Sequence, residues 1–403
     1  MPVAALDTTL VLVLLASVPV AVAALLVTSL VGIVIHELAH ALVGRLLGFR
    51  ILEVVVGHGR GVRCWVWGDL VLTLHALPFA GYVRWQAFEP RGLRWRLAAA
   101  ILAGPLSNVA VALLVGVPVV GMLRDAAWHR SIWLLFAGCA ASVALVRAVF
   151  GFAVATVPPP PGRPTDMAQI LQLWRRPPDW AARVCEAGAA LAATHDSFAT
   201  FLRGDGPGMR RWLAQAVPAG LEAGAWASVR ALLQLATGDP GAAIGSQREC
   251  VAWCEARAAA GGADGTPAAA AAADAAAMVW AARTGLAAYL AELPAGLAEA
   301  SSLLREVPWA DLPPLELAQA QRVQGQVLLA VGEPQAAEPW LAKAWAAAEQ
   351  PWQRAVTATG LAAVAVARGD RRGARRWLRR AQRLHRDSPL LQSRWAQLRA
   401  MAA

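Results

Sequence analysis

His36-Glu37-Leu38-Ala39-His40 lies inside an apolar run that extends from about Leu10 to Leu47. Ionisable side chains at bilayer depth cost roughly 2.5–3.5 kcal/mol on insertion scales, so those that persist there usually perform chemistry or line a polar cavity. On a helix, positions 36 and 40 share one face and can hold one metal ion, with position 37 beside them as a general base. The pattern therefore predicts zinc bound by His36 and His40.

Hydrophobic residues make up 57% of the 403-residue chain, which is high for a soluble globular protein. Three segments reach the roughly 20 residues that a membrane-spanning helix needs, namely 10–47, 97–120 and 132–157. The first is too long for a perpendicular span, and we expect either one long tilted helix or two helices broken near Thr28 or Gly32. The sequence therefore predicts a mostly α-helical, multi-pass bundle, integral to the cell membrane and in contact with the lipid bilayer.

The net charge of +10 is carried by 37 basic residues, of which only Lys343 is a lysine. Seven arginines fall in the loop 49–96, whereas the link 121–130 carries two. By the positive-inside rule the longer loop is cytoplasmic, and so is everything after Val157. Within this loop, 52–56 and 62–74 are rich in β-branched and aromatic residues, and we expect them to form short strands or a hairpin.

The C-terminal half of the chain is rich in alanine and arginine and shows helical periodicity. The turn dipeptides Gly332-Glu333 and Gly369-Asp370 are 37 residues apart, close to the period of about 34 of tetratricopeptide helix pairs. We expect repeats at 315–349 and 351–386 with a capping helix at 388–401, and generic helical packing is the alternative.

These patterns divide the chain into three parts. Residues 1–175 are expected to form a membrane-embedded metalloprotease domain, residues 176–215 a helical linker, and residues 216–403 a cytoplasmic, tetratricopeptide-like repeat domain that binds a protein partner.

A third zinc ligand is required, because catalytic zinc usually keeps three protein side chains and one open position. Asp166 is the best candidate, since it follows the proline-rich segment 158–164 near the cytoplasmic end of the third expected span. Asp125 should lie on the opposite side of the membrane, while Glu89 and Asp69 can simply balance the arginines of their loop. Asp166 is also a candidate helix cap.

Four stretches in order resemble the site-2 protease family of intramembrane zinc metallopeptidases: residues 36–40, Pro78-Phe79-Ala80-Gly81-Tyr82-Val83, Ala103-Gly104-Pro105-Leu106-Ser107-Asn108, and Asp166. The resemblance covers about residues 25–175. It implies zinc at His36, His40 and Asp166, Glu37 as general base, and Gly104 to Asn108 on a helix packed beside the site. It also implies that the segment around Gly81 forms a β element that presents extended substrate.

The chain departs from this family at two positions. Family members usually have Asn-x-x-Pro ahead of the ligand Asp, where this chain has Ala155, and Gly after the Asp, where it has Met167. Asn108 can supply the missing oxyanion donor, and a small polar contact between helices is its alternative role.

The expected function is hydrolysis of a peptide bond in the transmembrane segment of a membrane-protein substrate, as in regulated intramembrane proteolysis. The alternative is a catalytically weak or silent membrane scaffold whose helical repeats bind protein partners. The basic run between Arg371 and Arg383 is most simply a solvated helix face. The alternative is a surface that binds anionic lipid. Nucleic acid is not expected as a partner, because no recognition fold accompanies the charge.

Overall fold

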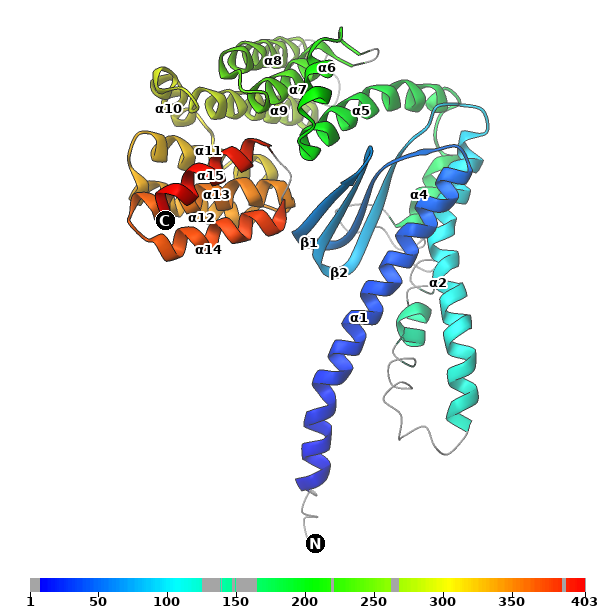
Figure 1. Ribbon diagram of the computed structural model, residues 1–403. Coiled ribbons are helices and arrows are strands. Elements are labelled where there is room, and N and C mark those ends of the chain that lie inside the picture. The colour runs from blue at the N-terminus through cyan, green and yellow to red at the C-terminus, as the bar shows by residue number, and fades with distance from the viewer. Residues whose placement is uncertain are drawn as a thin grey trace. The chain divides into compact units, whose positions relative to one another are not determined.

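In the computed structural model the chain is mostly helical, with one small antiparallel sheet after the first helix, as the sequence predicts (Figure 1). The structure describes residues 8–124, 138, 140–146, 149, 165–218, 221–261, 268–385 and 389–402. The chain divides into two compact units. The first unit holds the chain up to Gly59 together with Leu74–Cys185, and the second holds Arg60–Thr73 together with Glu186–Ala403.

Two long apolar helices, α1 (Thr8–Leu46) and α2 (Leu93–Arg124), pack side by side in the first unit (Figure 1). Their segments Val22–Leu46 and Leu93–Leu114 are long and apolar enough to cross a membrane. Large apolar side chains cover their outer faces, as expected of helices that contact lipid. The α1 helix runs unbroken through Thr28 and Gly32, so it takes the single-helix form of the two expected. Most of the third expected span, 132–157, lies outside the described residues, and a multi-pass topology stays a prediction.

The sheet is a hairpin of two long strands, β1 (Arg50–Trp67) and β2 (Leu70–Gln86), joined through Gly68 and Asp69. The sequence predicts shorter strands because glycines normally interrupt them. The structure instead carries β1 through Gly57, which adopts a φ of +95°. A Cβ atom at Gly57 would lie 2.9 Å from the carbonyl oxygens of His75 and Leu77, so the close pairing of the strands requires glycine there.

The short helix α4 (Asp166–Trp174) packs against α2 and begins at a defined residue. The Thr165 side chain caps it by accepting a hydrogen bond from the backbone N–H of Ala168. Leu173 packs against Ala98 and Ile101 of α2. The start of α4 is therefore held both by its cap and by an apolar contact with α2.

The second unit is built from helices that follow one another in antiparallel pairs. Glycines with positive φ end three helices, Gly238 (+92°), Gly332 (+87°) and Gly369 (+74°), as left-handed residues commonly do at helix C-termini. The helices are α5 (Trp180–Arg203), α6 (Gly206–Leu213), α7 (Ala223–Ala236), α8 (Pro240–Gly261), α9 (Ala268–Leu290), α10 (Leu297–Arg305), α11 (Pro314–Ala330), α12 (Pro334–Ala347), α13 (Pro351–Ala367), α14 (Arg371–Leu384) and α15 (Pro389–Ala402).

The helix pairs agree in position with the expected repeats. The α11–α12 pair spans 314–347 and the α13–α14 pair spans 351–384, and α15 follows where a capping helix is expected. Their assignment as tetratricopeptide-like stays a prediction. The α5 and α6 helices, which the sequence places in a linker, contribute to the core of the second unit.

The tip of the β hairpin, residues 60–73, belongs to the second unit and is held there by hydrogen bonds to its main chain. The Gly61 N–H donates to the Glu349 carbonyl at 2.6 Å, and Arg354 Nη1 donates to the Gly61 carbonyl at 2.8 Å. On the other side of the tip, His195 Nε2 lies 2.8 Å from the Asp69 carbonyl, and Arg203 donates to the Gly68 carbonyl. The sequence predicts one domain over 1–175, whereas the structure groups 60–73 with the helices.

Apolar contacts reinforce these bonds. Val71 is 5% exposed and packs in one core with Phe201, Leu202 and Met209, and Cys64 lies against the same cluster. The tip is therefore a structural part of the helical unit.

Gly61→Leu is expected to release the hairpin tip from the helical unit. A Cβ atom there would lie 2.4 Å from Pro351 Cδ and 2.5 Å from the Glu349 carbonyl oxygen, and overpacking of this kind costs about 1–3 kcal/mol. Alkylation of Cys64 in the folded protein, measured by peptide mass spectrometry, should become about tenfold faster. The control is Val62→Leu, because Val62 is 43% exposed. If Cys64 is alkylated at the wild-type rate in Gly61→Leu, the hairpin tip is not held by the contacts of Gly61.

Candidate metal centre

Two histidines of α1 and the first residue of α4 converge on one point. His36 Nε2 lies 3.1 Å from Asp166 Oδ2 and 3.1 Å from His40 Nε2, and His40 Nε2 lies 3.5 Å from Asp166 Oδ2. Each residue offers one donor atom to a shared space, with all three atoms within 4.8 Å of one another. Among the described residues, this is the one group of three or more such side chains that could hold a metal ion.

The far nitrogens of both imidazoles are held by α2, which fixes the direction of the rings. His40 Nδ1 lies 2.8 Å from the Ala100 carbonyl. Because a carbonyl can only accept, Nδ1 carries the proton and Nε2 presents its lone pair to the shared space. A metal-bound histidine usually donates its other N–H to such an acceptor.

His36 is oriented by a side chain instead. The Asn108 amide lies 3.0 Å from His36 Nδ1. Turning the Asn108 amide group by 180° exchanges its nitrogen and its oxygen, so the oxygen can face Nδ1 and accept its proton. In that orientation Nε2 of His36 is also free to bind a metal.

Gly104 leaves the room that an ion needs. A Cβ atom at this position of α2 would lie 2.3 Å from His40 Nε2 and 2.6 Å from His36 Nε2. Any side chain would therefore occupy the space on which the donor atoms converge. Two neutral imidazoles, one carboxylate and this space fit a zinc ion.

Asp166 is ionised in this setting. Burial alone would raise the pKa of its carboxyl group, but the side chains of His36 and His40 beside it outweigh burial and lower the pKa to about 2. The carboxylate is therefore available as a ligand throughout the neutral pH range.

The sequence model of peptidase family M50 matches residues 23–307, which include the histidine pair, the hairpin and Asp166. The chain belongs to peptidase family M50, the site-2 protease family. No curated protein matches the chain. As a member of this family it is a metallopeptidase of the site-2 protease type, and the family is associated with membranes.

Glu37, which lies between the two histidines in sequence, is next to the cluster and against the hairpin. Its side chain is 3% exposed. A Cβ atom at Gly81 of β2 would lie 2.5 Å from Glu37 Oε1 and 2.7 Å from the Val55 carbonyl oxygen, so glycine lets the strand backbone approach the carboxylate. The contact places the main chain of β2 beside the group expected to act as general base.

The other acidic candidates, Glu89, Asp69 and Asp125, are not part of the described cluster. Glu89 is exposed, and its backbone carbonyl accepts a hydrogen bond from Arg96. Asp69 belongs to the turn of the hairpin in the second unit. Asp125, like Ala155, lies outside the described residues.

The structural roles of Ala100, Gly104 and Gly81 at the cluster could not be predicted from the sequence. The Ala100 carbonyl leaves no signal in the amino-acid pattern, because any residue could supply it. Gly104 and Gly81 do stand in the family motifs, but only the three-dimensional structure shows what each would displace.

Proposed function

We propose that this chain is a zinc endopeptidase that cleaves a transmembrane segment of a membrane-protein substrate. The convergence of His36 Nε2, His40 Nε2 and Asp166 Oδ2 beside the buried Glu37 carries the proposal. These three residues would hold the ion. When bound, zinc supplies Lewis-acid chemistry that activates water and polarises a peptide carbonyl.

The protein groups supply proton transfer and orientation. Glu37 is placed to take a proton from the attacking water and to return it to the leaving amine, the usual role of the glutamate in this motif. Ala100 and Asn108 hold the two imidazole rings through their Nδ1 atoms. Asn108 is therefore a positioning residue in this proposal, and its oxyanion role stays a prediction.

The hairpin offers a way to present substrate. In the described part of the chain β2 pairs with β1 alone, so its other edge has main-chain groups available for pairing. A substrate helix must unwind before its peptide bond can be attacked, and an unwound segment can add to such an edge as a strand. Because Gly81 of β2 abuts Glu37, this edge would bring the unwound segment near the catalytic groups.

We further propose a multi-pass arrangement with the C-terminal helical unit in the cytoplasm, where it binds a protein partner. The arginine bias of the loop 49–96 over the link 121–130 supports this orientation. A catalytically silent scaffold is less well supported, because the full set of His36, Glu37, His40 and Asp166 is assembled in one place.

The test is metal content and cleavage measured on the same preparation. The purified full-length protein in lipid nanodiscs should bind about one zinc ion and cleave a fluorescent single-span substrate. A chelator should abolish the cleavage and added zinc should restore it.

His40→Ala should lose both the metal and the cleavage. His58→Ala is the control, because His58 is an exposed histidine of the hairpin. Cleavage by a His40→Ala protein that contains no metal would contradict the proposal.

A further inference from the structure

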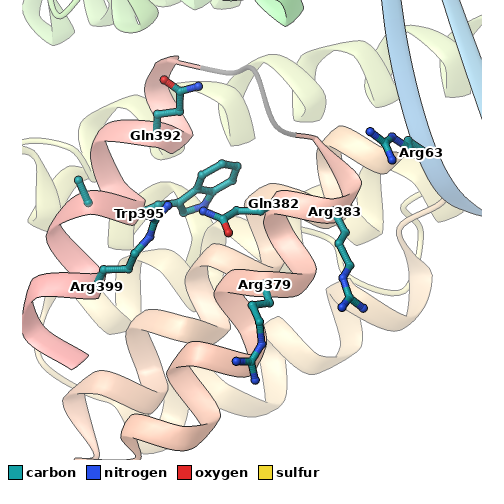
Figure 2. A pocket seen from close by; sticks show the side chains of 8 residues that line it. Arg63, Arg379, Gln382, Arg383, Gln392, Trp395 and Arg399 are labelled. Atoms are coloured by element: carbon teal, nitrogen blue, oxygen red, sulfur yellow. The ribbon is translucent and has the colours of Figure 1, made fainter. Parts of the chain in front are cut away.

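A basic pocket lies in the second unit, and none of its lining residues belongs to the metal centre. It is a hollow of about 750 Å³ between α14, α15 and the tip of β1 (Figure 2). Four arginines and two glutamines line it: Arg63, Arg379, Arg383, Arg399, Gln382 and Gln392. The volume falls within the range of small-molecule sites, about 300–1,000 Å³.

The arginines of this pocket differ from others in the same unit. Arg248, Arg283 and Arg368 each pair with a glutamate, and so does Arg394, which shares α15 with Arg399. Among the described residues no carboxylate lines the pocket, and none of its four arginines is ion-paired with a described acidic residue. The pocket therefore concentrates positive charge that a bound anion would neutralise.

The floor of the pocket is the packed side chain of Trp395. Trp395 is 1% exposed and packs with Leu378, Leu384 and Leu391. Its Nε1 donates a hydrogen bond to Thr359 Oγ1 at 2.8 Å. The pocket floor is therefore already formed, and only the exposed arginine side chains must be ordered when a ligand binds.

We propose that this pocket binds an anion that carries two or more phosphate groups. A guanidinium group matches a phosphate with two parallel hydrogen bonds, and each phosphate brings about 1.5–2 negative charges, so two of them balance four arginines. Gln382 and Gln392 add amide groups that can bond to phosphate or hydroxyl oxygens.

The pocket is less suited to nucleic acid. The ring of Trp395 is buried, and the lining offers no other aromatic face on which a base could stack. The ligand would link α14 and α15 to Arg63, two residues beyond the docked Gly61, and so strengthen the attachment of the hairpin tip.

The experiment is calorimetric titration of the full-length protein in detergent with inorganic tripolyphosphate. The pocket variant is Arg379→Gln/Arg383→Gln. The control is Arg372→Gln/Arg376→Gln, which removes the same charge at the same spacing on the same helix, outside the pocket. We expect the pocket variant to weaken binding by at least about tenfold and the control by less than about threefold. Unchanged melting temperatures would show that both variants fold.

Further titrations distinguish a soluble phosphorylated compound from a lipid headgroup, and either of these from an acidic peptide. Binding to tripolyphosphate indicates a soluble phosphorylated compound, whereas binding only to nanodiscs that contain a phosphoinositide bisphosphate indicates a lipid headgroup; both support the proposal if the pocket variant removes it. Equal loss in the pocket variant and the control would overturn it, because the effect would then be general charge. Absence of binding, or binding of polyglutamate alone, would also overturn it.

Discussion

Glu37→Gln is expected to reduce cleavage of a transmembrane substrate by about 10²–10⁴-fold, the usual contribution of general acid–base catalysis. The substitution keeps the size and shape of the side chain but removes its ability to accept a proton at neutral pH. Because Glu37 is buried against Gly81, a side chain of the same size should leave the hairpin in place. The rate should be measured under single-turnover conditions in nanodiscs.

Two further measurements show whether the loss of cleavage in Glu37→Gln comes from the missing base. Zinc content should stay at the wild-type level, because the proposed ligands are His36, His40 and Asp166. Glu89→Gln is the control, since it makes the same chemical change at an exposed position of the first unit. Wild-type turnover in Glu37→Gln would rule out the proposed role of this carboxylate and favour a different base.

Gly104→Ala is expected to remove the metal. The added methyl carbon would lie 2.3 Å from His40 Nε2 and 2.6 Å from His36 Nε2, inside the space shared by the donor atoms. Substitutions that only disturb the support of a ligand weaken metal binding by about 10–100-fold, and a methyl group in the ion's own place should cost more. Metal analysis after dialysis against a weak chelator measures the loss.

Ala110→Val is the control for Gly104→Ala. It adds volume to the same helix at an exposed position, so it should leave zinc content unchanged. Retention of one zinc ion in Gly104→Ala would contradict the prediction, because it would show that the ion does not need the space beside Gly104.

The sequence was most informative where chemistry imposes a spacing. The separation of His36 and His40 by one helical turn predicts a shared face, and the structure brings their Nε2 atoms within 3.1 Å. Asp166 is 130 residues away, and the structure places its carboxylate beside His36 as the sequence predicts. Asp166 could be predicted because catalytic zinc needs a third ligand and this carboxylate follows a proline-rich segment near the cytoplasmic end of the third expected span.

The contacts between the hairpin tip and the C-terminal helices could not be predicted from the sequence. Nothing in the local pattern of 60–73 shows that Gly61 will bond to Glu349 and Arg354, nearly 300 residues later. The basic residues of α14 likewise suggest a solvated face when read along the chain. Only folding brings Arg379 and Arg383 together with Arg63 and Arg399 around one hollow.

The two strands of the hairpin contribute residues to both units, and this limits where the protein can be truncated. Deleting residues after Cys185 would remove the partners of Val71 and Cys64 and leave an apolar strand end in water. Such an end, with main-chain groups available on both edges, is a template for aggregation. A fragment truncated after Cys185 is therefore expected to aggregate, so the peptidase region should be expressed together with the C-terminal helices.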